Sequence, residues 1–126
     1  MSQTNTIAGY ELVIMSDRNR RFLGWIRLLD SQNNNAGYVY ITDDPVKPRL
    51  GGGGRLPQPY VVMSRPIAEL GVLLSVLNDG RAKTIRFADN NPQEPSAFIE
   101  HTVAQLDGDE LAALSHFGGG SAPPPE

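Results

Sequence analysis

Residues 21–42 read RFLGWIRLLDSQNNNAGYVYIT and contain the clearest strand pattern of the chain. Two runs with alternating apolar and polar side chains, 21–29 and 38–42, flank a polar turn that contains three consecutive asparagines. Alternation with a period of two is typical of β-strands, and a short polar connection favours their pairing as a hairpin. The sequence therefore predicts that these two strands form a β-hairpin.

The two faces of this hairpin differ in chemistry. The expected core face carries five apolar side chains: Phe22, Ile26, Leu28, Val39 and Ile41. The opposite face carries aromatic rings and arginines, and we interpret it as a candidate binding surface of Arg21, Trp25, Arg27, Tyr38 and Tyr40. Such residues are enriched at protein interfaces, and their rings also suit stacking on unpaired bases. The alternative is that arginine stacks on tryptophan within the monomer, or that a long loop covers this face.

Further strands are predicted at 7–15, 60–64, 83–88 and 97–103. The first of these is expected to be central in its sheet, because both of its sides are mostly apolar. A helix is predicted over 66–79, with Pro66 at its first position and Gly80 as its stop signal. This helix is apolar around most of its circumference, so we expect it to be buried on most sides, under the C-terminal segment or a second subunit.

The order of these elements predicts one α+β domain. We expect a curved antiparallel sheet of five to six strands in the order ββββαββ, with one main buried helix and a barrel-like arrangement as one possibility. The domain is expected to span 7–117, after a flexible N-terminus at 1–6 and before a disordered tail at 118–126. Asp107 and Glu110 resemble a capping box for a short final helix.

A Pro/Gly-rich stretch at 45–59 is predicted to be a flexible loop, since it holds four prolines and four glycines. A phosphate-binding P-loop needs a lysine and a hydroxyl residue after its last glycine, whereas Arg55 and Leu56 follow here. Long loops of this kind are often functional. We therefore add its three basic residues to the candidate binding residues: Lys47, Arg49 and Arg55.

Charge is distributed unevenly along the 126 residues. Residues 1–88 hold eleven basic and seven acidic side chains, a net charge of +4, whereas 89–126 hold seven acidic and no basic ones, a net charge of −7. Such asymmetry marks nucleic-acid or partner binding, or solvated faces that differ in sign. The sequence shows neither a secretory signal nor a membrane-spanning stretch, so we expect a cytoplasmic protein.

Catalytic and metal-binding signals are weak. The chain has no cysteine, which excludes thiol nucleophiles, disulfides and cysteine metal sites. His101 adjoins Glu100, but neighbours on a strand point to opposite faces and do not form a dyad. The acidic run 107–110 lacks the ligand spacing of a calcium loop. We therefore expect no enzyme, no cofactor and no metal.

The sequence favours a small non-enzymatic binding module that acts through a protein partner or through self-association. The alternative is a single-stranded nucleic-acid-binding protein that uses the aromatic and arginine-bearing sheet face.

Overall fold

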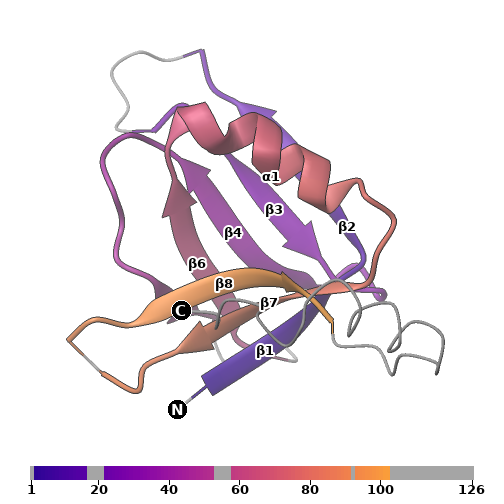
Figure 1. Ribbon diagram of the computed structural model, residues 1–126, viewed down its shortest axis with the longest axis vertical. Helices are drawn as coiled ribbons and strands as arrows, with labels where there is room; N and C mark the ends of the chain where they lie inside the picture. Colours follow the sequence, from indigo (N-terminus) through magenta and orange to yellow (C-terminus); the bar gives the residue numbers. More distant parts are fainter. Residues whose placement is uncertain (1, 17–21, 53–57, 92, 103–126) are drawn as a thin grey trace, which may run out of the picture.

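The computed structural model describes residues 2–16, 22–52, 58–91 and 93–102 (Figure 1). These residues form two β-sheets and one short helix, which is an α+β fold as predicted. The predicted single sheet is wrong, because the strands divide between a five-stranded sheet and a three-stranded sheet. Neither sheet closes into a barrel, because each has two different strands at its ends. Among the described residues the helical segments are too short to form a transmembrane helix.

The five-stranded sheet, called here the large sheet, has the order β2-β3-β4-β6-β5. Its strands are β2 (Gly9–Ile14), β3 (Gly24–Leu29), β4 (Asn35–Ile41), β5 (Arg49–Gly51) and β6 (Tyr60–Arg65). The predicted hairpin is confirmed, since β3 and β4 pair in antiparallel fashion. Contrary to the all-antiparallel prediction, β4 and β6 are parallel, which the long connection between them allows.

This connection is the stretch that was predicted to be a flexible loop at 45–59. Part of it instead forms β5, which pairs with β6 at the edge of the large sheet. Residues 53–57 lie outside the described residues. The interpretation as one uninterrupted loop is therefore wrong, because residues 49–51 find a neighbouring strand only after the chain has turned back.

The three-stranded sheet, called here the small sheet, has the order β1-β7-β8 and is antiparallel throughout. It consists of β1 (Ser2–Ile7), β7 (Lys83–Ala88) and β8 (Ser96–His101). The predicted flexible N-terminus at 1–6 thus forms most of β1. The predicted strand at 7–15 is divided at Ala8, with its two parts in different sheets.

Asn5 explains how such a polar segment becomes a strand. Its side chain is 1% exposed, and its amide nitrogen donates hydrogen bonds to the carbonyl oxygens of Ala36 at 2.9 Å and Pro59 at 2.8 Å. A buried amide that satisfies two main-chain acceptors replaces the apolar contact expected at such a position. β1 is therefore attached to the large sheet by hydrogen bonds, which an apolar pattern does not reveal.

The helical segment begins after Pro66 with a 3₁₀ turn, η1 (Ile67–Glu69), and continues as α1 (Leu70–Leu77). Gly80 follows with a φ of +77°, as expected for a helix stop. In the described part of the chain α1 is less buried than predicted, since only Leu77 is buried and Val72 is 67% exposed. The C-terminal segment that was expected to cover the helix lies outside the described residues. Within the described residues one side of α1 packs on the core and the other faces solvent.

α1 and the small sheet lie in front of the large sheet in Figure 1, and the core is formed between these layers. Four residues of the predicted core face are fully buried there: Ile26, Leu28, Val39 and Ile41. Gly37 lets the layers approach closely, because a Cβ at this position would lie 3.0 Å from Ile85 Cδ1 and 2.7 Å from the Val61 carbonyl oxygen. The other side of the large sheet carries the candidate binding surface. The predicted final helix and the tail at 118–126 lie outside the described residues.

Candidate functional site

The outer face of the large sheet, which points away from α1, gathers four of the predicted site residues. In the β3–β4 ladder Trp25 lies opposite Tyr40, and Arg27 lies opposite Tyr38. Directly opposed residues of two strands project to the same side, so these four side chains share one surface. All four are partly exposed.

Phe22 belongs to this surface, although it was expected on the core face. Its ring centroid lies 6.2 Å from that of Trp25 and 5.0 Å from that of Tyr40. The prediction extended the strand alternation back to Phe22, whereas β3 begins only at Gly24. Outside the strand the period of two no longer determines the direction of the side chain.

Tyr60 at the start of β6 also joins the surface and was not predicted. Its ring packs edge-on against Tyr38, with centroids 5.4 Å apart and an interplanar angle of 80°. The ring planes of Tyr38 and Tyr40 are nearly parallel, with an interplanar angle of 12° and a centroid distance of 6.2 Å. The aromatic row, as we call it, thus holds five of the nine aromatic residues of the chain: Phe22, Trp25, Tyr38, Tyr40 and Tyr60.

Gly51 on β5 supports one end of the aromatic row. A Cβ at this position would lie 2.3 Å from Tyr60 Cε2, so the tyrosine ring rests directly against the backbone of the neighbouring strand. Gly51 and Tyr60 are opposite partners in the β5–β6 ladder. The absence of a side chain at Gly51 therefore leaves the space that the Tyr60 ring fills.

Two adjoining hollows open on this surface. The first has a volume of about 400 Å³ and is lined by Met15 and four rings of the aromatic row: Phe22, Trp25, Tyr38 and Tyr40. The second, of about 240 Å³, shares Phe22 and Tyr40 with the first and is completed by Thr42, Asp44, Val46 and Arg49. The first hollow has no charged side chain in its lining, and the second has one of each sign.

The predicted basic residues are placed unequally around this surface. Arg27 Nη1 lies 3.5 Å from Glu11 Oε2 across the β2–β3 ladder, an exposed pair of the kind that contributes little to stability. Arg49 lines the second hollow, whereas Lys47 is exposed and lines neither hollow. Arg21 and Arg55 lie outside the described residues.

A separate cluster of titratable side chains surrounds Asp79, just after α1. The Asp79 carboxylate accepts a hydrogen bond from the Arg81 amide at 2.9 Å and lies 2.7 Å from His101 Nε2 and 3.1 Å from Lys83 Nζ. The Arg81 amide, the His101 side chain and Lys83 together hold the pKa of Asp79 well below its usual range. This cluster fastens the turn after α1 to β7 and β8.

The expected separation of His101 from Glu100 is confirmed. Glu100 instead accepts a hydrogen bond from Arg86 Nε at 2.8 Å, on the other face of the small sheet. None of the Asp79, Lys83 and His101 side chains lines either hollow of the aromatic row. Among the described residues, no three His, Cys, Asp or Glu side chains are grouped as metal ligands.

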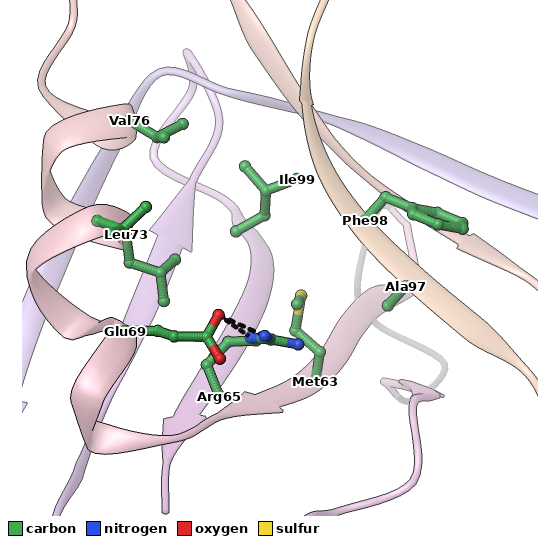
Figure 2. Close-up of a pocket in the computed structure, with 9 residues that line it drawn as sticks. Met63, Arg65, Glu69, Leu73, Val76, Ala97, Phe98 and Ile99 are labelled. Carbon is green, nitrogen blue, oxygen red and sulfur yellow. Dashed lines mark hydrogen bonds and ion pairs between the residues drawn. The ribbon is translucent and has the colours of Figure 1, made fainter. Parts of the chain in front are cut away.

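A third hollow, of about 290 Å³, lies between α1, β6 and β8 and was not predicted (Figure 2). Its lining is mainly apolar and includes Met63, Leu73, Val76 and Ile99. Arg65 and Glu69 form an ion pair beside these apolar side chains (Figure 2). The two charged groups neutralise each other, so the surface of this hollow is mainly apolar.

Comparison of the chain with protein-family models, with curated proteins and with solved structures finds no match.

Proposed function

We propose that this chain is a small non-enzymatic binding module whose aromatic row binds a segment of a protein partner. The observation that carries the proposal is the contiguous set of five rings on the outer face of the large sheet, with an open hollow of about 400 Å³ among them. Tryptophan and tyrosine are the residues most enriched among interface hot spots. The hollow also has a size typical of ligand pockets, about 300–1,000 Å³.

The arrangement of the rings favours an apolar side chain as the group that is bound. Phe22 packs edge-on against Trp25, and Tyr60 packs edge-on against Tyr38, so the rings hold one another in place. A surface whose rotamers are already held loses little conformational entropy on binding. The first hollow is lined by rings and a methionine, which suits an apolar group of the partner.

Binding of single-stranded nucleic acid is the second candidate function, and the position of the arginines supports it. Arg27 lies beside Tyr38 in the ladder, and Arg49 lines the second hollow next to Tyr40. Guanidinium groups bind phosphates, and each base stacked on an aromatic ring contributes about 1–3 kcal/mol. An oligonucleotide could therefore place bases on the rings and its backbone along the arginines.

Peptide selection with a matched oligonucleotide measurement tests the proposal. Short random peptides displayed on phage are selected on the immobilised protein, and their Kd is measured for the wild type, for Tyr40→Ala and for Val72→Ala on the opposite side. We expect selected peptides to bind at least about tenfold more weakly to Tyr40→Ala and equally well to Val72→Ala.

The nucleic-acid measurement uses a labelled thymidine oligonucleotide at about 50 and 200 mM salt. Binding to phosphates releases condensed counterions, so the affinity for an oligonucleotide falls steeply as the salt concentration rises over this range. Tight, salt-dependent oligonucleotide binding that requires Tyr40, without any peptide that requires it, would establish the second candidate instead. If neither ligand depends on Tyr40, both candidate functions of the aromatic row are wrong.

A further inference from the structure

The outer edge of β2 is the least protected strand edge among the described strands. β2 ends the large sheet and has β3 as its one neighbour there. Leu12, Val13 and Ile14 are 40%, 36% and 58% exposed. An edge strand presents unpaired N–H and C=O groups, and exposed apolar side chains beside them favour pairing with another chain.

Unlike in β2, no large apolar side chain is exposed in the other described edge strands, β1, β5 and β8. β5 has three residues, one of them Arg49, and β1 is polar from Ser2 to Thr6. β8 ends in Glu100 and His101. Like β1, residues 9–15 contain no proline and no basic residue, which are common means of blocking an edge, and they add exposed apolar side chains that the other edge strands lack.

The side chains of β2 have the character of a strand with neighbours on both sides. Leu12 and Ile14 lie opposite Ile26 and Gly24, on the face that carries α1, whereas Val13 lies opposite Trp25 on the outer face. This apolar pattern on both faces was the reason to expect a central strand. The structure places β2 at an edge, and both facts are satisfied if a further strand pairs with it.

We propose that this strand is β2 of a second copy of the chain, paired antiparallel about a two-fold axis. Such an interface is self-complementary, because each copy presents the same surface to the other. The pairing would join the two large sheets into one continuous sheet across two copies.

The charge pattern of β2 supports a second copy as the occupant. Glu11 is the sole charged residue in 9–15. If the axis passes at Leu12, Glu11 faces Val13 of the other copy, and if it passes at Val13, Glu11 faces Met15. In neither register do two carboxylates meet, and like charges placed directly opposite would be destabilising. In both registers Leu12 and Ile14 of the two copies form one apolar stripe.

The pairing would also place two aromatic rows close together, and the effect of this on partner binding rests on the proposed function. A two-fold axis perpendicular to the sheet leaves the outer faces of both copies on the same side. The β3 strands of the two copies are then three strand spacings apart, about 14 Å. Two aromatic rows would face one partner, which would make binding bivalent.

Cysteine cross-linking tests the register, because the natural chain has no cysteine. Leu12→Cys, Val13→Cys and the control Val72→Cys on α1 are oxidised mildly at micromolar concentration. We expect rapid formation of a disulfide dimer from Leu12→Cys or Val13→Cys, whichever lies at the axis, and slow formation from Val72→Cys, whose residue is 67% exposed. If neither β2 variant cross-links faster than Val72→Cys, the proposal is overturned.

Sedimentation velocity gives an independent test. The wild type should shift with concentration from 13.7 kDa toward twice that mass, and so should Val72→Lys. Ile14→Lys should stay at the mass of one chain with an unchanged circular dichroism spectrum. A monomeric wild type, or dissociation by both substitutions, would overturn the pairing. Loss of the dimer in Ile14→Lys with peptide binding retained would separate this proposal from the function of the aromatic row.

Discussion

Trp25 and Tyr40 are directly opposed across the β3–β4 ladder, and the ring of Phe22 packs against both of them. The tryptophan is therefore held by other aromatic rings on the outer face and not by the core of the protein. Substitutions on the outer face should therefore change the proposed binding more than the free energy of unfolding, because the buried residues on the other side of β3 stay in place.

Replacement of Trp25 by alanine should weaken binding of the selected peptides more than it weakens the fold. We expect a loss of stability well below the ~3–5 kcal/mol that truncation of a core tryptophan costs. Urea unfolding followed by circular dichroism measures this loss. Ile26→Ala, at a neighbouring position with 0% exposure, serves as the core control at about 2–5 kcal/mol. Equal losses in the two variants would contradict the outer position of Trp25.

Gly51→Ala should disturb binding through Tyr60. The added Cβ would overlap the tyrosine ring, so the ring must move while the backbone of β5 stays paired. Binding of the selected peptides should weaken, and chemical shifts of Tyr60 should change in NMR spectra. Gly71→Ala on α1 is the matched control, because a Cβ there meets nothing within 4 Å. That control should raise stability by about 0.5–1 kcal/mol through higher helix propensity and should leave binding unchanged.

Two substitutions in α1 should differ sharply in their effect on stability. Leu77→Ala removes a buried side chain and should cost about 2–5 kcal/mol, whereas Val72→Ala, at a 67% exposed position, should change stability by less than about 0.5 kcal/mol. Thermal unfolding measures both. Similar losses would mean that the exposed side of α1 is covered in solution.

Asn5→Ala should show that β1 is an integral strand. The substitution removes the Asn5 amide from the buried carbonyl oxygen of Ala36 and from the partly buried hydrogen bond to Pro59, which should cost about 1–3 kcal/mol. Thr4→Ala at an exposed neighbouring position is the control and should be nearly neutral. A stable Asn5→Ala variant would indicate that the N-terminal segment is dispensable.

The Asp79 cluster should make stability depend on pH. The pKa of Asp79 is lowered in the folded protein, so the stability that Asp79 contributes is present above its unfolded pKa of about 4. This stability is lost as the pH falls from there through the lower pKa of the folded state. Asp79→Asn should therefore be less stable than the wild type at pH 7, and the difference should shrink on acidification. His101→Gln is a control that keeps the carboxylate bonded to Arg81 and Lys83. An unchanged difference between pH 7 and pH 3 would contradict this role of Asp79.

Local patterns in the sequence were sufficient for the hairpin and for the aromatic surface. The alternation in 21–29 and 38–42 correctly assigns Ile26 and Val39 to the core and Trp25 and Tyr40 to the outer face. This works because successive side chains of a strand point to opposite faces wherever the strand happens to lie. The α+β class follows in the same way from the apolar run and Gly80 that mark the helix.

The division of the strands between two sheets, the identity of the edge strands and the rings that complete the surface became known from the three-dimensional arrangement. β1 exists because Asn5 finds acceptors at Ala36 and Pro59, far along the chain. Tyr60 meets Tyr38 because β6 lies parallel to β4, and no local pattern specifies a neighbour across a long connection. The apolar side chains on both faces of β2 indicate that this strand favours contact with other apolar groups, but they do not indicate whether the same chain or another chain provides these groups. Periodicity records what each residue prefers to touch, whereas pairing between distant segments depends on the free energy of the whole arrangement.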